Sequence, residues 1–96
     1  MAVFMQIRLP VTTRQYDTLI ARMRSEGPDF YKGRLANIVV HDPGGGVLIT
    51  DLWESEADQA AFLRRMLPIA AELGLPSPAN PPTIAEAHTY WLPQAG

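Results

Sequence analysis

The stretch that decides the fold reads VLITDLW over residues 47–53 and ESEADQAAFL over residues 54–63. The first part is an apolar run that ends at Trp53, which predicts a strand. Ser55 is typical of a residue that caps the N-terminus of a helix, so the helix begins two residues after the strand. This junction places a large aromatic side chain at a strand end, where small α/β domains often form pockets.

The chain before this junction contains one predicted strand and one predicted helix. Residues 3–9 alternate between two sets of side chains, which predicts a half-buried strand. Thr12 and Gln15 match a capping box, in which each side chain accepts a hydrogen bond from the other residue's amide. Apolar residues that follow Tyr16 at helical spacing predict an amphipathic helix, which Gly27 ends.

Two strands flank a glycine turn in the middle of the chain. Residues 35–41 are rich in β-branched side chains, which predicts a strand. The glycines at 44–46 permit positive φ angles, so this strand and the strand at 47–53 form a predicted β-hairpin. After the second helix, a proline-rich connector at 74–82 leads to a last predicted strand at 83–92.

The element order β-α-β-β-α-β is that of the ferredoxin-like fold, which belongs to the α+β class. Right-handed crossovers place both helices on one face of a four-stranded antiparallel sheet. The length of 96 residues predicts a single domain over residues 1–96. Because the other sheet face has no helix to cover it, we expect a homodimer.

The composition argues against several classes of function. Eight basic and ten acidic residues, with no basic run, disfavour binding to nucleic acid or to an anionic membrane. The absence of cysteine excludes disulfides, thiolate nucleophiles and cysteine-based metal sites. No apolar run approaches the ~18 residues of a membrane span, and the N-terminus lacks a signal-peptide pattern. We therefore expect a cytoplasmic protein.

Several residues share their type and order with a known group of proteins, and these are Thr12, Thr13, Tyr16, Asp17, Gly45, Gly46, the run from Asp51 to Ser55, Phe62, the run from Leu67 to Gly74, and His88. In this pattern the chain resembles the dimeric α/β-barrel superfamily, which includes the antibiotic-biosynthesis monooxygenases. The resemblance implies that two subunits pack their sheets face to face, with a pocket between each sheet and its helices or loops. It implies no single activity, because the superfamily includes oxygenases, isomerases, dehydratases and haem-handling enzymes.

Trp53 is the first candidate for a substrate-binding residue. In haem-degrading and quinone-forming members of the superfamily, a Trp followed two residues later by Ser lines the pocket. The resemblance therefore implies that Trp53 contacts a flat substrate. The alternative is a core Trp that packs between strand and helix, because its large apolar area favours burial.

A second group of candidates lies on the last predicted strand. With the two-residue period of a strand, Glu86, His88 and Tyr90 share one face. His88 could act as a general base, Glu86 could orient it, and the Tyr90 phenol could donate a hydrogen bond. The alternative is a ladder of hydrogen bonds at the dimer interface.

Further candidates lie on the other strands. His41 could be a second catalytic imidazole, with Asn37 as an oxyanion donor on the same strand face, or it could face solvent beside the turn. Arg8 could bind an anionic or phenolate oxygen, or it could pair with Glu86 or Asp51. Asp51, on the predicted strand at 47–53, is another candidate for binding the substrate. A one-residue shift in register reverses the faces, so the sequence leaves open which face lines a cavity.

The histidine spacing does not favour a metal site, because the chain has no His-x-His or His-x-x-x-His pair. In haem-degrading relatives the proximal His lies on the second helix, where this chain has none. The resemblance, together with titratable and aromatic residues on plausible inward faces, implies a small cofactor-independent enzyme that acts on an apolar aromatic or polyketide-like molecule. The reaction is oxygenation, cyclisation or isomerisation, and it begins with proton abstraction. The alternative is a non-enzymatic ligand-binding or interaction module of the same fold.

Overall fold

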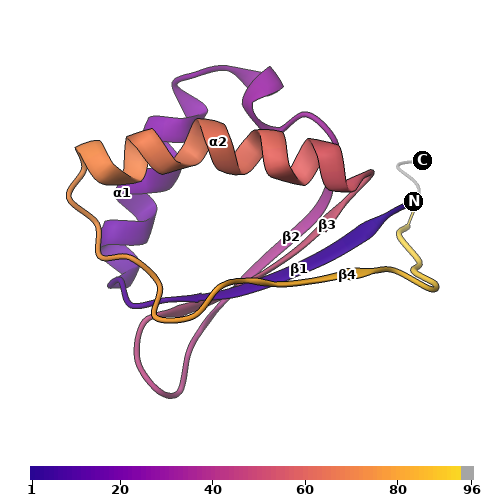
Figure 1. Ribbon diagram of the computed structural model, residues 1–96. Coiled ribbons are helices and arrows are strands. Elements are labelled where there is room, and N and C mark those ends of the chain that lie inside the picture. The colour runs from indigo at the N-terminus through magenta and orange to yellow at the C-terminus, as the bar shows by residue number, and fades with distance from the viewer. Residues whose placement is uncertain (94–96) are drawn as a thin grey trace.

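The chain folds into a four-stranded sheet with two helices packed on one side of it (Figure 1). The computed structural model describes residues 1–93. In chain order the elements are β1 (Val3–Leu9), α1 (Thr13–Arg24), the short 3₁₀ helix η1 (Pro28–Tyr31), β2 (Arg34–His41), β3 (Val47–Trp53), α2 (Glu56–Glu72) and β4 (Thr83–Glu86). The strands lie in the order β2-β3-β1-β4, and each neighbouring pair is antiparallel. This arrangement confirms the predicted α+β, ferredoxin-like fold.

Both helices begin where the sequence predicts. The Thr12 hydroxyl accepts a hydrogen bond from the Gln15 amide at 3.0 Å, and the Gln15 side chain accepts one from the Thr12 amide at 2.8 Å. The Ser55 hydroxyl accepts a hydrogen bond from the Asp58 amide at 3.1 Å, so α2 begins soon after β3 ends at Trp53. Over residues 1–93, neither helix is both long enough and apolar enough to cross a bilayer.

The last strand is shorter than the sequence predicts. β4 ends at Glu86 and does not continue to residue 92. The reason is its partner, because β4 pairs antiparallel with β1 and Glu86 lies opposite Val3, the first residue of β1. One more backbone hydrogen bond follows, from the Ala87 amide to the Ala2 carbonyl at 2.9 Å. Because β1 begins at Val3, it offers no further residue with which a longer β4 could pair.

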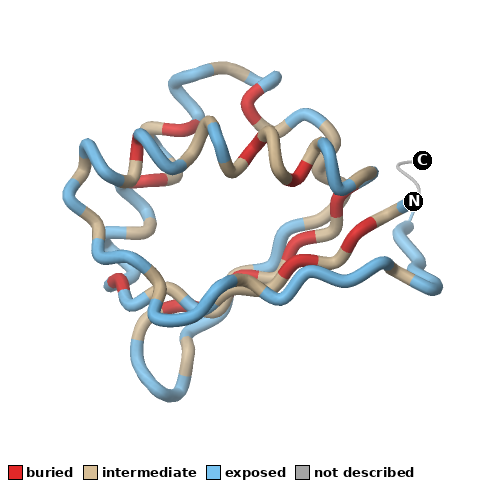
Figure 2. The backbone as a smooth tube through the Cα atoms, in the orientation of Figure 1, coloured by how far each residue is buried: buried red, intermediate tan, exposed pale blue. Residues whose placement is uncertain are grey.

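The buried residues gather between the sheet and the helices (Figure 2). Alternate residues of β3 point to this side, among them Ile49 and Trp53. Leu19 of α1 and Phe62 of α2 pack against them from the helices. The same alternation carries one acid into the buried row, because Asp51 lies between Ile49 and Trp53 on β3.

The opposite face of the sheet has no helix over it (Figure 1). Ile38 and Val40 of β2 point to this side, and they are 61% and 47% exposed. Trp91, which follows β4 in the chain, is 82% exposed. Exposed apolar side chains therefore lie on the uncovered face of β2 and in the segment after β4.

Candidate functional site

A small cavity lies between the sheet and the two helices, and we call it the inner cavity. Its volume is about 50 Å³, and β1, β2, β3, α1 and α2 all contribute to its walls. Most of the lining side chains are apolar, as is typical of ligand pockets. Five polar residues interrupt the apolar walls, and we call them the polar cluster: Tyr16, Arg34, Asn37, Asp51 and Gln59.

Asp51 is a buried acid in the polar cluster, and its residue is 2% exposed. Asn37 lies opposite it on β2, and the Asn37 Nδ2 donates a hydrogen bond to Asp51 Oδ1 at 2.6 Å. Burial raises the pKa of the Asp51 carboxyl above its usual range, while the Asn37 hydrogen bond and the charge of Arg34 oppose this rise. A carboxyl in this state exchanges its proton closer to neutral pH than an exposed Asp does, which suits general acid–base chemistry.

Trp53 is fully buried behind the cavity wall. The centre of its ring lies 5.0 Å from that of Phe62. Phe62 lines the inner cavity, whereas Trp53 does not. The Trp53 Nε1 has no hydrogen-bond partner among residues 1–93. Its N–H nevertheless lies close enough to Asp51 to lower the pKa of that carboxyl. The structure therefore places Trp53 in the core, one aromatic ring away from the inner cavity.

The two helices contribute two further members of the polar cluster. Burial, and secondarily the negative charge of Asp51, raises the pKa of Tyr16 to about 12. The Tyr16 phenol is therefore neutral at physiological pH and can donate a hydrogen bond. Gln59 of α2 is 3% exposed, and its amide provides both a donor and an acceptor.

The inner cavity adjoins a wider depression, which we call the outer depression. Its volume is about 290 Å³, and it shares Tyr16, Arg34 and Asn37 with the inner cavity. Tyr31 of η1 lines it as well, and the guanidinium carbon of Arg34 lies 4.1 Å from the centre of the Tyr31 ring. This distance is typical of a cation–π contact. Arg34 therefore lies where the linings of the outer depression and the inner cavity meet.

The sequence does not predict Arg34 in this site, because strict strand alternation puts it on the face opposite to Asn37. The ladder between β2 and β3 is irregular between Arg34 and Ala36, which pair with Trp53 and Leu52. The extra residue between them is a β-bulge that shifts the alternation by one position. As a result, Arg34 and Asn37 both line the inner cavity.

Tyr16 and Gln59 do have a signal in the sequence. Tyr16 precedes Leu19 by three positions on α1, and Gln59 precedes Phe62 by three positions on α2. Positions three and four apart share a helix face, so a polar residue in register with the apolar stripe points inward. The sequence predicts Tyr16 as a core residue, because helix periodicity alone does not distinguish core from cavity.

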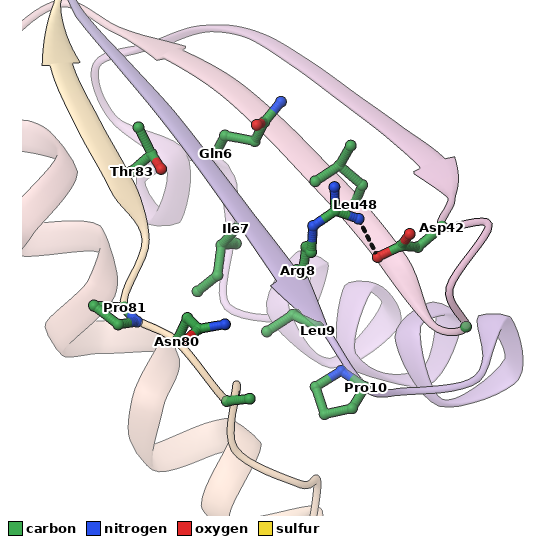
Figure 3. A pocket seen from close by; sticks show the side chains of 12 residues that line it. Gln6, Ile7, Arg8, Leu9, Pro10, Asp42, Leu48, Asn80, Pro81 and Thr83 are labelled. Carbon is green, nitrogen blue, oxygen red and sulfur yellow. Dashed lines mark ion pairs between the residues drawn. The ribbon is translucent and has the colours of Figure 1, made fainter.

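Arg8 lies on the other face of the sheet, where Figure 3 shows it beside Asp42. The Arg8 guanidinium forms an ion pair with the Asp42 carboxylate at 2.5 Å. The predicted pairing of Arg8 with Glu86 or Asp51 is wrong, because Asp51 points toward the helices and Glu86 lies opposite Val3, at the other end of β1. Arg8 and Asp42 line an open groove of about 380 Å³, which we call the outer groove. It is larger than the inner cavity, but these two charges already neutralise each other.

Neither histidine lines the inner cavity. His41 shares a strand face with Asn37, as the alternation predicts, and it is exposed at the end of β2. His88 lies beyond β4 and is exposed, and Tyr90 is 54% exposed. Because β4 stops at Glu86, the predicted alignment of Glu86, His88 and Tyr90 on one strand face is wrong.

Within residues 1–93, no three His, Asp or Glu side chains lie together in a way that could hold a metal ion. The polar cluster has a single carboxylate, from Asp51, surrounded by amide, phenol and guanidinium groups. Such a set can donate hydrogen bonds to a ligand and can exchange one proton with it.

Solved structures of other proteins share this fold. A candidate antibiotic biosynthesis monooxygenase from Chloroflexus aurantiacus is 22% identical, with a TM-score of 0.62 over 95% of this chain and 97% of the other. SnoaB, a cofactor-independent oxygenase from Streptomyces nogalater, is 12% identical, with a TM-score of 0.60 over 93% of each chain. The chain has the fold of these proteins. A haem-degrading protein from Mycobacterium tuberculosis is 17% identical, with a TM-score of 0.54 over 95% of this chain and 99% of the other.

At these identities the likeness extends to the fold alone. No family model matches the sequence, and no curated protein matches it. The resemblance to the fold of antibiotic-biosynthesis-monooxygenase-like proteins is confirmed. The activity has to be argued from the residues of the site itself.

Proposed function

We propose that this chain is a small cofactor-independent enzyme of the cytoplasm that acts on an apolar aromatic or polyketide-like molecule of secondary metabolism. The observation that carries the proposal is the buried Asp51 carboxyl, which accepts a hydrogen bond from Asn37 beside an apolar cavity. A buried acid with a raised pKa is uncommon in a structural core and is typical of catalytic sites. A cofactor-independent oxygenase shares the fold, which makes oxygenation one candidate reaction.

In the proposed mechanism the substrate first gives a proton to Asp51. The raised pKa of the Asp51 carboxyl makes its carboxylate a stronger base than that of a surface Asp. The second N–H of the Asn37 amide and the Tyr16 phenol donate hydrogen bonds to the oxygen on which negative charge develops. Phe62, supported by Trp53 behind it, packs against the ring of the substrate.

The resulting anion can react in two ways. In oxygenation, a carbon of the electron-rich phenolate forms a bond to O₂, and the resulting hydroperoxide loses water to leave a quinone, so the substrate supplies all the electrons and one oxygen atom leaves as water. In cyclisation or isomerisation, the protonated Asp51 returns the proton to a different atom of the substrate. Both routes benefit from the exclusion of water by the apolar walls of the inner cavity.

We propose an alternative arrangement for the five other residues that the sequence suggests. His41 and His88 are candidate bases, and Arg8, Glu86 and Tyr90 are candidate binding residues. All five lie outside the inner cavity, so these roles require a substrate bound at the surface or at a boundary between subunits. Variants of the two histidines separate this arrangement from the one centred on Asp51.

We further propose that the protein is a homodimer in which the two uncovered sheet faces pack together. The exposed Ile38 and Val40 side chains support this proposal, since a second copy would remove them from water. Trp91, at 82% exposure, is also available to a partner chain. A domain of this size has a small core, and dimerisation would add buried apolar area.

The variant Asp51→Asn tests the catalytic proposal. The Asn side chain keeps the shape of Asp and an oxygen that can accept the Asn37 hydrogen bond, but it cannot accept a proton. We expect the wild type to convert at least one member of a panel of polycyclic phenols, measured by O₂ uptake and by mass spectrometry of the products. Asp51→Asn should lower turnover about 10²-fold or more, as is typical for loss of a general base. The control variants His41→Ala and His88→Ala should retain turnover.

The outcome of this experiment also assigns the base. Full turnover by Asp51→Asn would overturn the proposed mechanism. Loss of turnover in a histidine variant, with Asp51→Asn active, would move the proton transfer to that histidine.

The second candidate function is a non-enzymatic ligand-binding module. The volume of the inner cavity, about 50 Å³, favours it, because this space admits only a small part of an aromatic molecule. The hydrogen bond between Asn37 and Asp51 also satisfies both side chains without a ligand. Binding of the phenols in calorimetry, with no product and no O₂ uptake, would support this function.

A further inference from the structure

Arg34 is a half-buried cation at the boundary between the inner cavity and the outer depression. Its side chain forms no ion pair and no hydrogen bond with any other residue in the described part of the chain. Arg8 and Arg22, in contrast, both pair with acids. The N–H groups of Arg34 are therefore available to a ligand.

The contact with Tyr31 orients this guanidinium. The Arg34 Cζ atom lies 4.1 Å from the centre of the Tyr31 ring. A guanidinium held over an aromatic face keeps the N–H groups along its edge free for bidentate hydrogen bonds. The β-bulge turns Arg34 toward the helices. A guanidinium whose orientation is fixed by Tyr31 therefore lies beside the inner cavity.

A row of aromatic rings runs from Arg34 into the core. The Tyr31 ring is stacked on that of Phe62 at a centroid distance of 5.8 Å, and Phe62 contacts Trp53 at 5.0 Å. Tyr31 lines the outer depression and Phe62 lines the inner cavity. A flat ligand that packs along this row therefore has its outer end near the Arg34 guanidinium.

We propose that Arg34 binds an anionic group, a carboxylate or an ionised phenol, on an otherwise apolar aromatic ligand. This inference rests on the proposed function, because it names the substrate class of the same cavity. Two acids lie nearby, Asp51 in the inner cavity and Asp17 at the outer depression, and neither forms an ion pair with Arg34. Asp17 is exposed, and the Asp51 carboxyl accepts the hydrogen bond from Asn37.

Two small probes test the inference, 2-naphthoate and 2-naphthamide. They have the same ring and nearly the same shape, but only the naphthoate is charged. We would titrate each into the ¹⁵N-labelled full chain and follow the indole N–H signals of Trp53 and Trp91. We expect both probes to shift the Trp53 signal, with the naphthoate binding about tenfold tighter because its hydrogen bonds to Arg34 are charge-assisted.

The variant Arg34→Gln removes the cation, and Arg24→Gln is its matched control. Arg24 also lines the outer depression, so both variants change the net charge equally in the same region. We expect Arg34→Gln to weaken naphthoate binding about tenfold and to leave naphthamide binding within about twofold. Arg24→Gln should leave both affinities within the same limit. Arg34→Lys keeps the charge without the planar fork, so we expect an intermediate loss, and it replaces Arg34→Gln if that variant does not fold.

Several outcomes would overturn the inference. Equal affinity of the wild type for both probes, unchanged naphthoate binding in Arg34→Gln, or an equal loss of both probes in that variant would each exclude recognition of the anion by Arg34. These results leave the proposed function intact, because the probes still reach the cavity. If neither probe shifts Trp53 in the wild type, or if only Trp91 responds, both the inference and the proposed function are wrong.

Discussion

Removal of the Asn37 amide is a direct perturbation of the buried Asp51 carboxyl. The Asn37 Nδ2 donates to Asp51 Oδ1 at 2.6 Å, and although Asn37 itself is exposed, its removal deprives a carboxyl whose residue is 2% exposed of this donor. A hydrogen bond to a charged group contributes about 1.5–3 kcal/mol to stability, and one between neutral groups about 0.5–1.5 kcal/mol. We expect Asn37→Ala to lower the free energy of unfolding by about 2 kcal/mol near neutral pH.

The size of this loss depends on pH. Burial raises the pKa of Asp51 in the folded chain above the value of about 3.9 in an unfolded chain. The folded chain therefore holds a proton that the unfolded chain has released, and stability falls as pH rises from the unfolded pKa through the folded pKa. Without Asn37 the folded pKa of Asp51 is higher still, so the variant loses more stability above that pKa. Near pH 3.5 both proteins hold the proton, and the expected loss is about 1 kcal/mol.

Urea unfolding at fixed protein concentration measures these differences. The double variant Asn37→Ala/Asp51→Asn, compared with Asp51→Asn alone, should lose about 1 kcal/mol at both pH values, because only a neutral hydrogen bond is removed. Gln6→Ala is a control for pH, since it removes a neutral hydrogen bond to Thr50 of 3.1 Å on the other sheet face. An equal loss for Asn37→Ala at both pH values and in both backgrounds would show that the charge of Asp51 does not set the loss.

Two further predictions concern the scaffold. Gly33 has a φ of +89°, and a Cβ there would lie 2.4 Å from Asp58 Oδ2, so Gly33→Ala should cost about 1–3 kcal/mol in thermal unfolding; an unchanged Tm would contradict this. The variant Ile38→Lys places a charge on the uncovered sheet face, and sedimentation velocity should show a dimer for the wild type and a monomer for the variant. A wild type that is monomeric at high concentration would exclude the proposed homodimer.

The fold could be predicted from local patterns because each decisive signal lies within a few residues. The capping box at Thr12 and Gln15 marks the start of α1, and the Ser55 cap marks that of α2. The end of β4 depends instead on a partner distant in sequence, because Glu86 lies opposite the first residue of β1. No local pattern contains this information, so the sequence predicts too long a strand.

The candidate site was predictable only in part for a similar reason. Asn37 and Asp51 are both sequence candidates, but their hydrogen bond follows from the register between β2 and β3. Arg34 enters the site through a β-bulge, which reverses the face that strand alternation assigns to it. Arg8 has the residue type that suits anion binding, but it lies on the opposite face and pairs with Asp42.

A crystal structure of the wild-type protein soaked with a polycyclic phenol that it binds tests directly whether the inner cavity is the substrate site. We expect electron density along the inner cavity and the outer depression, with the phenol oxygen within hydrogen-bond distance of Asp51 or Asn37. Density confined to the outer groove beside Arg8, or to the uncovered sheet face, with the inner cavity closed, would contradict it.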